Sequence, residues 1–431
     1  MGRGSAPFWL WPSAALILGL IAGSVLGRFT DVEGGWAAFA LYNGGADAAR
    51  SFVELSATAL ATITALTLSL TVISLQLASS QYSPRLIEHY LHDGPTRFVY
   101  SLFLGTFAFA IATLLNIRLP GPEDEFGRVP NVAVAVLVVL LVCSLGALVF
   151  FVHRVTAFMR VESILRRVRD RTFEGIANQP KGGDGDDPES IPAFPDDAHP
   201  IRSRRSGYYA AIDWEAVKDY EGERHSRVWI VVTPGAFVTT GMPVAVVDGE
   251  IDQEVADEIE SWLLFDEERW IEHDVAYGVH NLVDVALTAL SPGVNDPTTA
   301  ITAIERVGET IGRAGNDRDT RVLTTDAGTR VIIAQREWAD ILHAAVRQVF
   351  EYGGHDVEVV LAILRMLVGL AWVDSDVDRS DPIAAVGGHL RTWIGDLADR
   401  QPSDRERIER GFEQLACALR HEVVVDDGYH L

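Results

Sequence analysis

Residues 54–85 read ELSATALATITALTLSLTVISLQLASSQYSPR, and this stretch decides how the rest of the chain is interpreted. Between Leu55 and Gln76 it contains no charged residue, no glycine and no proline. At about 1.5 Å per residue, a helix of this length crosses a hydrocarbon core of roughly 30 Å. The stretch therefore predicts a membrane-spanning helix.

This predicted helix is rich in hydroxyl groups, which fall on two stripes when residues are placed about 100° apart. The first stripe holds five polar side chains: Thr58, Thr62, Ser69, Gln76 and Ser80. The second stripe lies nearly opposite and holds Ser56, Thr67, Thr71, Ser74 and Gln81. One interpretation is that small hydroxyl residues pack helices together. The alternative is that one stripe lines an aqueous or ion path. The helix carries no carboxylate or histidine between Leu55 and Gln76, which argues against a proton relay.

Three further apolar stretches, at residues 12–27, 98–117 and 132–152, predict a total of four spans. The first could instead be a signal peptide, but no clear small-residue cleavage site follows it. Six arginines come soon after the last span: Arg154, Arg160, Arg166, Arg167, Arg169 and Arg171. Because cytoplasmic flanks carry excess positive charge, the C-terminal part is expected in the cytoplasm. With four spans, the N-terminus is expected there too.

Residues 154–178 predict an amphipathic, arginine-rich neck helix after the fourth span. Apolar residues recur at steps of three and four: Val155, Phe158, Val161, Ile164 or Leu165, and Val168. Three partners are open for this apolar face. It could pack on the soluble domain or on copies of itself around an oligomer axis, or its arginines could bind the lipid surface.

The remaining sequence predicts a cytoplasmic mixed α/β domain that is mostly helical. Residues 179–204 are rich in glycine, proline and aspartate and predict a disordered acidic linker. Residues 205–250 alternate short apolar runs with turn residues and predict a small β-unit. Helical patterns fill residues 251–425, apart from a hairpin expected at 321–334. The fold class is therefore an α-helical membrane protein, with four transmembrane helices in residues 1–153 and this attached domain.

Composition limits the function further. The chain has 431 residues, 48% of them hydrophobic, and a formal net charge of −24. Most of the acidic excess follows Asp184, so nucleic acid is not an expected partner. Only two cysteines occur, Cys143 and Cys417, which gives neither a disulfide framework nor a metal cluster. No phosphate-binding glycine loop, HExxH or CxxC motif is present, so no metal or cofactor is expected.

Two motifs resemble a known family. They are LASSQYSPRL at residues 77–86 and HNLVDVALTALSPGVNDPTTAI at residues 280–301. Together with four N-terminal spans, they resemble the bacterial predicted membrane protein family called domain of unknown function 2254. The resemblance implies an inner-membrane protein with a cytoplasmic C-terminal domain. It implies no settled activity, substrate or catalytic residue.

The second motif contains a signature loop with six notable residues: Ser291, Pro292, Gly293, Asn295, Asp296 and Pro297. A helix–loop–helix corner explains them, since Pro292 and Gly293 turn the chain and Asn295 or Asp296 caps the next helix. A functional alternative is that the free amides at that helix start hold an anion. His280 and Asp284 share a helix face and could form an acid–base pair, but nothing else supports catalysis, so no enzyme is expected.

The end of the uncharged helix carries a predicted collar of Gln81, Tyr82 and Arg85, which either anchors the helix or gates a pore. The leading hypothesis is an ion channel or permeation pathway in the inner membrane, formed by a homo-oligomer and regulated by the cytoplasmic domain. Four spans enclose little space alone, which is why an oligomer is expected. The alternative is a membrane-anchored scaffold or sensor whose acidic domain binds a cytosolic protein. Membrane lipid is a partner in either case.

Overall fold

The long uncharged stretch is helical in the computed structural model of the protein. The structure describes residues 9–28, 45–81, 94–119, 128–158, 161–178, 198–220, 227–248, 252–314, 320–325, 328–334, 336–373, 377–395 and 401–422. Within these ranges there are thirteen helices and eight strands. The chain divides into two units, residues 1–160 and residues 161–431.

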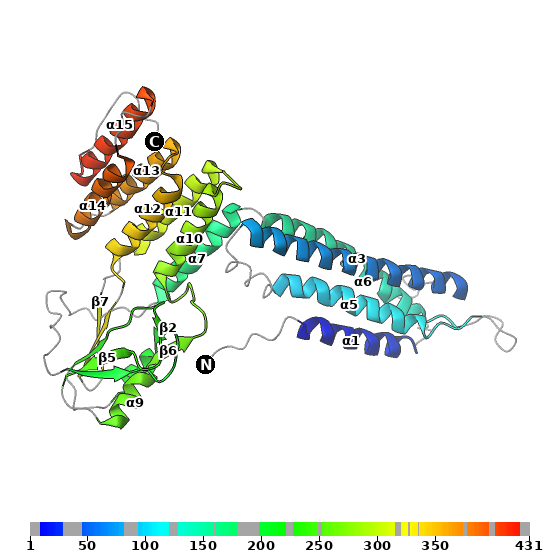
Figure 1. Ribbon diagram of the computed structural model, residues 1–431. Helices are drawn as coiled ribbons and strands as arrows, with labels where there is room; N and C mark the ends of the chain where they lie inside the picture. The colour runs from blue at the N-terminus through cyan, green and yellow to red at the C-terminus, as the bar shows by residue number, and fades with distance from the viewer. Residues whose placement is uncertain are drawn as a thin grey trace. The chain divides into compact units, whose positions relative to one another are not determined.

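The described residues of the first unit form four apolar helices: α1 (Leu10–Leu26), α3 (Ala46–Gln81), α5 (Gly94–Leu114) and α6 (Asn131–Phe158) (Figure 1). Three of them contain segments long and apolar enough to cross a membrane, namely Ala46–Ser74, Gly94–Leu114 and Asn131–Thr156. The fourth, α1, is apolar but has only 17 residues. Length and composition therefore identify three candidate spans, and α1 is a shorter apolar helix at the position of the first predicted span.

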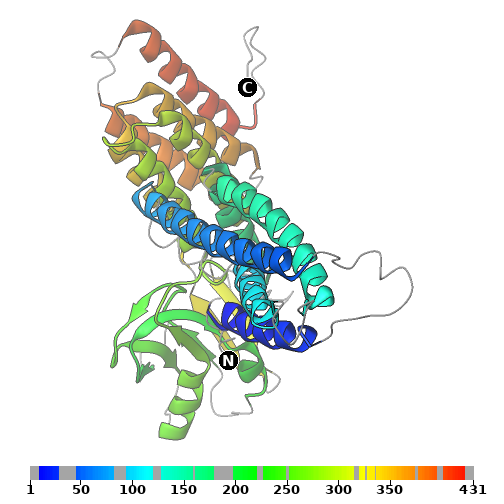
Figure 2. The same ribbon diagram turned by 90° about the vertical axis from the view of Figure 1, so that its right-hand side faces the viewer.

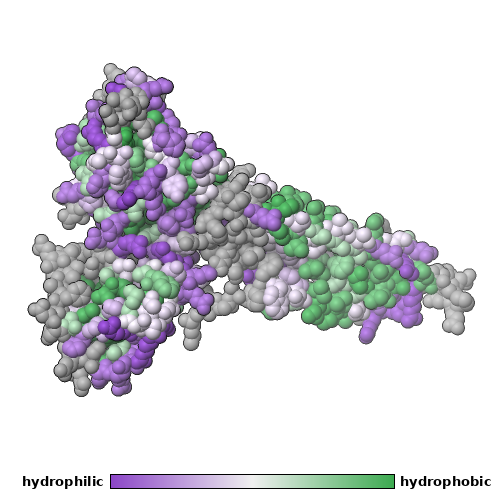
Figure 3. Space-filling view, in the orientation of Figure 1, coloured by the Kyte–Doolittle hydropathy of each residue, from purple (hydrophilic) through white to green (hydrophobic). Residues whose placement is uncertain are grey.

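α5 is the central helix of this unit, because it packs against α1, α3 and α6 (Figures 1 and 2). One buried cluster joins Val53 and Ala57 of α3 to Phe109 of α5 and Leu137 of α6. The opposite side of α6 points outward and is almost purely aliphatic. Its exposed side chains include Val138, Val139, Val142, Leu145 and Val149. The surface of this unit is accordingly green over much of Figure 3.

α1 lies very close to α5 because glycines line their contact. A Cβ atom placed on Gly19 would lie 2.2 Å from the carbonyl oxygen of Gly105, and one on Gly23 would lie 2.7 Å from that of Phe109. Residues four apart share a helix face, so these two glycines form one flat strip. This is the small-residue spacing typical of tightly packed membrane helices. The spacing is visible in the sequence as Gly19 and Gly23.

The second unit contains two sheets. The five-stranded sheet has the order β1-β5-β3-β8-β7, and the three-stranded sheet has the order β4-β2-β6. The strands are β1 (His199–Arg202), β2 (Gly207–Ile212), β3 (Arg227–Ile230), β4 (Phe237–Val238), β5 (Pro243–Val247), β6 (Leu263–Asp266), β7 (Thr320–Thr324) and β8 (Arg330–Ala334). All neighbours are antiparallel except β3 and β8, which are parallel. The hairpin expected at 321–334 is present as β7 and β8. β1 lies inside the stretch 179–204 that was predicted to be a disordered linker, so that prediction is wrong at the end of the stretch, where pairing with β5 orders the chain. β6 was not predicted either.

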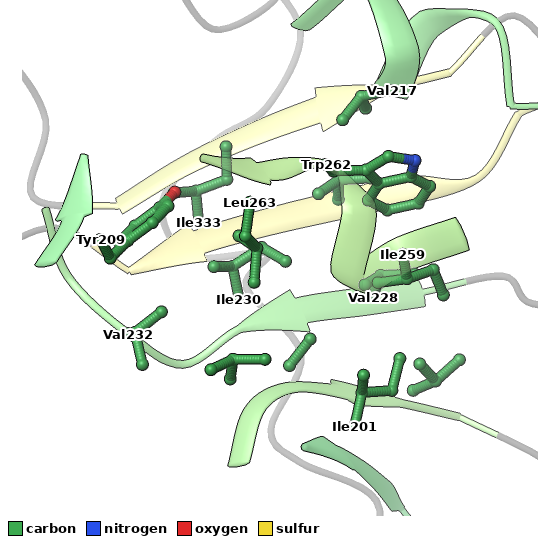
Figure 4. Close-up of a cluster of buried hydrophobic side chains, with 14 of the residues drawn as sticks. Ile201, Tyr209, Val217, Val228, Ile230, Val232, Ile259, Trp262, Leu263 and Ile333 are labelled. Atoms are coloured by element: carbon green, nitrogen blue, oxygen red, sulfur yellow. The ribbon is translucent and has the colours of Figure 1, made fainter. Parts of the chain in front are cut away.

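The core of the sheet region brings β3 together with a short helix and its following strand. Val228 and Ile230 of β3 are buried beside Ile259 of α9 (Gln253–Ser261), Trp262 and Leu263 (Figure 4). Tyr220 packs edge-on against Trp262, with ring centroids 5.0 Å apart. The sequence favoured one helix over 252–263, but the structure ends it at Ser261 and starts β6 at Leu263. Burial of both Trp262 and Leu263 stabilises this change from helix to strand.

Nine helices belong to the described part of this unit. Besides α9 they are α7 (Val161–Asn178), α8 (Trp214–Lys218), α10 (Val275–Leu290), α11 (Pro297–Ala314), α12 (Trp338–Gly353), α13 (Val357–Val373), α14 (Val377–Ile394) and α15 (Pro402–Leu419). α13 packs against α11 and α15. The broad pattern of helices after residue 336 agrees with the sequence-based prediction.

A tight joint connects the sheets to α10. Asp274 caps that helix by accepting a hydrogen bond from the amide of Tyr277 at 3.0 Å. The same carboxylate pairs with Arg269, whose guanidinium lies 4.5 Å from the centre of the Tyr277 ring. Gly235, at the turn before β4, has a φ of +81°, and a Cβ there would lie 1.7 Å from Asp274 Oδ2. Only glycine therefore fits this position.

α7 packs against α10 and α11 through the apolar face that the sequence predicted. Ile164, Leu165 and Val168 are buried, and Thr172 lies against Gly278 of α10. On the flanks, Arg169 pairs with Glu309 at 3.2 Å. Of the three partners considered for the neck, the structure shows the other helices of its own unit, α10 and α11.

Candidate functional site

The first hydroxyl stripe of α3 faces away from the other helices of its unit. Thr58, Thr62, Ser69 and Gln76 are all exposed. The side chains of Ser80 and Gln81 and all of Tyr82 and Arg85 lie outside the described part, so the predicted collar is not seen. The structure thus places four of the five predicted pore-lining residues on one uncovered face, and none of these four in the interior of the helix bundle.

The exposed hydroxyls have local partners. Thr58 donates to the carbonyl oxygen of Glu54, and Thr62 donates to that of Thr58, both at 2.9 Å. These bonds satisfy the hydroxyl protons and lower the cost of an apolar environment. The oxygen lone pairs still point outward and can accept a hydrogen bond or contact a cation.

Small side chains fill the space between the exposed hydroxyls. Ala61 and Ala65 lie on the same face as Thr58, Thr62 and Ser69 and are exposed as well. Leucines flank this strip, and the three most exposed of them are Leu55, Leu66 and Leu68. A strip of small residues between larger ones lets a second helix approach closely. Neither α5 nor α6 does so, because both pack on the other side of α3.

The second hydroxyl stripe is inside the unit. Ser56, Thr67, Thr71 and Ser74 are all buried. Thr71 lies 2.6 Å from the hydroxyl of Tyr100 on α5, and its own hydroxyl also bonds to the carbonyl of Thr67. Sequence reasoning identified this stripe but missed its partner. The signal available was the series of polar residues on α5, where Thr96, Tyr100, Thr106 and Thr113 are all buried.

The signature loop is an exposed corner between α10 and α11. Pro292, Gly293, Val294 and Asn295 are exposed, and Asn295 adopts a left-handed φ of +49°. The amides of Val294 and Asn295 both donate to the carbonyl of Ser291, at 3.0 and 2.9 Å, which closes the turn. The predicted helix–loop–helix corner is therefore present.

Asp296, rather than Asn295, caps α11. Its carboxylate accepts one hydrogen bond from the Thr299 amide at 3.1 Å and another from the Thr299 hydroxyl at 2.6 Å. These bonds, the hydroxyl first, hold the pKa of Asp296 below its usual value. Pro297 follows as the first helical residue, where its missing N–H costs nothing. Because this carboxylate already occupies the helix start, an external anion would have to displace it.

His280 and Asp284 lie one turn apart on α10, with Nε2 and Oδ1 separated by 3.6 Å. Both side chains are partly exposed. Within the described ranges, no group of three or more histidine, cysteine, aspartate or glutamate side chains could hold a metal ion. The geometry allows an ion pair when the histidine is protonated.

One comparison with known proteins finds a family of predicted membrane proteins, and none assigns an activity. A family profile described as "Predicted membrane protein (DUF2254)" matches residues 5–368. Uncharacterized proteins of Mycobacterium tuberculosis and Mycobacterium bovis are 29% identical over 438 aligned residues, covering 97% of this chain and 80% of theirs. No solved structure matches the chain.

Proposed function

Because the chain belongs to the predicted membrane protein family DUF2254, we propose that it is a multi-pass protein of the bacterial inner membrane with both termini in the cytoplasm. Three helices have the length and composition of spans. α1 would supply a fourth crossing, since its glycine face lies directly on α5. The arginines at residues 154–171 would then lie at the cytoplasmic side.

In that membrane the protein would act as an oligomeric permeation pathway lined by α3. The observation that carries this proposal is the line of Thr58, Thr62, Ser69 and Gln76 on the face of α3 that its own unit leaves uncovered. Lipid tails offer these groups no partner, whereas a second copy or water does. Thr58, Thr62 and Ser69 carry the proposal, because they lie within the candidate span Ala46–Ser74, whereas Gln76 lies beyond its end.

The cytoplasmic unit would regulate this path. α7 follows α6 directly in the sequence and is fixed on α10 and α11 by buried apolar contacts. A partner or ligand that shifts α10 would therefore also shift α7, which follows α6 in the sequence. This arrangement offers a route for regulation without any enzymatic step.

Flux through liposomes tests the pathway. Thr62→Val keeps the shape of the side chain and removes its outward oxygen. If that oxygen contacts a passing ion, the loss of about 1 kcal/mol slows flux by about fivefold. Thr64→Val is the matched control, since Thr64 lies on the same helix, is partly buried and donates to the carbonyl of Leu60. Wild-type vesicles that pass no ion under any gradient would reject the pathway.

Cross-linking tests the oligomer separately. In a chain with Cys143 and Cys417 replaced by alanine, a cysteine at Thr62 is expected to form a disulfide with the same residue of a second copy. A cysteine at Val139, on the exposed face of α6, is the control. Equal cross-linking at both positions would indicate random collision and would contradict an interface on α3.

A second candidate is a scaffold that binds a cytosolic protein. It is favoured by apolar side chains on the outer face of the three-stranded sheet, where Phe237 is 55% and Leu264 is 42% exposed. Phe237 also packs edge-on against Tyr208, with ring centroids 5.1 Å apart. Pull-down from membranes with Phe237→Ser, compared with Thr62→Val, separates the two functions. Loss of a specific partner with the first variant alone supports the scaffold.

A further inference from the structure

Two hydroxyl groups on the uncovered face of α3 present oxygen lone pairs, and not protons, to their surroundings. Thr58 and Thr62 are exposed, and each donates its single hydroxyl proton to a backbone carbonyl at 2.9 Å. An anion needs hydrogen-bond donors, so it would first have to break these internal bonds. A cation needs only the lone pairs, which are already turned outward. This face therefore suits a cation better than an anion.

The same face becomes acidic toward the beginning of α3. Asp47, Ser51 and Glu54 precede Thr58 at steps of four and three residues, which keeps them on one side of the helix. All three are exposed. Carboxylates at the entrance of a narrow path raise the local concentration of cations and repel anions. The acidic end and the hydroxyl oxygens thus favour ions of the same sign.

Arg50 is the basic residue of α3, against the two acids Asp47 and Glu54. Its Nε atom lies 2.8 Å from Oε1 of Glu54, and the two side chains remain 49% and 48% exposed. An ion pair as exposed as this one is weak, so a passing cation can compete with Arg50 for the carboxylate. Arg50 reduces the negative charge at this end of the face without reversing it.

We propose that the path along α3 passes small inorganic cations, of which K⁺ is one, and excludes anions such as chloride. This inference rests on the permeation pathway proposed above and names the ions that it carries. Carboxylates attract the ion at one end of the path. The hydroxyl oxygens of Thr58 and Thr62 then replace part of its hydration shell within the candidate span.

Reversal potentials of the full-length protein in planar bilayers, under a gradient of KCl, test the selectivity. The bilayer is made of phosphatidylcholine, so that no anionic lipid attracts cations to the membrane surface. The reversal potential gives the permeability ratio of K⁺ to Cl⁻. For the wild type it is expected close to the equilibrium potential of K⁺.

The two halves of the ion pair give variants that should act in opposite directions. Glu54→Gln removes a carboxylate and is expected to lower the permeability ratio about fivefold. Arg50→Gln removes the opposing charge and should raise the ratio by a similar factor. Both variants break the same ion pair, so a purely structural role would move the ratio in the same direction in both.

Arg128→Gln is the control for charge. It removes the same positive charge as Arg50→Gln, but Arg128 lies outside α3 and donates to the carbonyl of Arg28 at 2.8 Å. The permeability ratio should therefore stay as in the wild type. A rise equal to that of Arg50→Gln would show that the net charge of the protein, rather than the face of α3, sets the selectivity, and would overturn the proposal.

The remaining outcomes separate this inference from the pathway itself. A wild type that carries no current under any gradient would reject the pathway and its selectivity together. A current that reverses at zero voltage, or at the equilibrium potential of chloride, would keep the pathway and reject selection of cations. A lower ratio in both Glu54→Gln and Arg50→Gln would also reject it, because the ion pair would then act only on the structure of α3.

Discussion

At the scale of single residues, Asp296 makes a pH-dependent contribution that can be measured. Its folded pKa is lowered by the Thr299 hydroxyl and amide, so its stabilising effect is present above the unfolded value of about 3.9. The effect is lost as the pH falls through the folded pKa. Asp296→Ala is expected to cost about 1 kcal/mol. Hydrogen exchange of the first-turn amides of α11 should then be about fivefold faster at neutral pH.

Asp296→Asn is the control for the charge. Asparagine caps helices about as well as aspartate does, so exchange at neutral pH should change little. The dependence between pH 5 and pH 2 should disappear, however, because the side chain no longer titrates. An unchanged pH profile in Asp296→Asn would mean that another group produces it.

Gly235 and Gly241 form a natural pair for separating backbone strain from a steric clash. Both have positive φ, +81° and +90°. A Cβ at Gly235 meets Asp274, whereas one at Gly241 meets nothing within 4 Å. Gly241→Ala is expected to cost about 1 kcal/mol from the backbone alone, and Gly235→Ala about 3 kcal/mol or more. Chemical unfolding measures the loss in free energy of unfolding for both variants. Equal losses would show that Asp274 moves aside for the new methyl group at little cost.

At the scale of elements, the sequence predicted α3 well but did not show which of its two hydroxyl stripes is buried. Both stripes consist of serine, threonine and glutamine, so residue type gives no difference between them. The choice depends on α5, where the buried Tyr100 meets Thr71. Strands of four or five residues were harder to predict than the buried face of α3. β6 follows α9 after a single residue, and its strand conformation depends on pairing with β2 rather than on local pattern.

The contact between α1 and α5 gives a prediction for an element. Gly19→Ala is expected to push α1 away from α5, because the new methyl group would overlap the Gly105 carbonyl. Gly146→Ala in α6 is the matched control, since a Cβ there meets nothing within 4 Å. Protease cleavage of a site inserted before α1 should become faster only in the first variant. Unchanged cleavage rates in both variants would show that α1 accommodates the methyl group without being destabilised.

At the scale of the whole molecule, most acidic residues lie in the second unit, which also contains the arginines of α7. Arg169, 21% exposed, contacts both Asp170 and Glu309. Arg169→Ala should therefore loosen α7 by about 1 kcal/mol or less, and high salt should reproduce part of the effect. Arg166, 61% exposed and 3.9 Å from Glu162, is the control. Hydrogen exchange along α7 is the measurement.

The parallel pairing of β3 with β8 has a consequence for synthesis. The edge of β3 at Val228 stays unpaired until β8, with Val331, has been synthesised. α9, α10 and α11 leave the ribosome between these two strands. The nascent chain therefore exposes a hydrophobic strand edge for several seconds at ordinary elongation rates. A chaperone that shields extended apolar segments is expected to hold chains stalled before residue 330 and to release those stalled beyond the end of the protein.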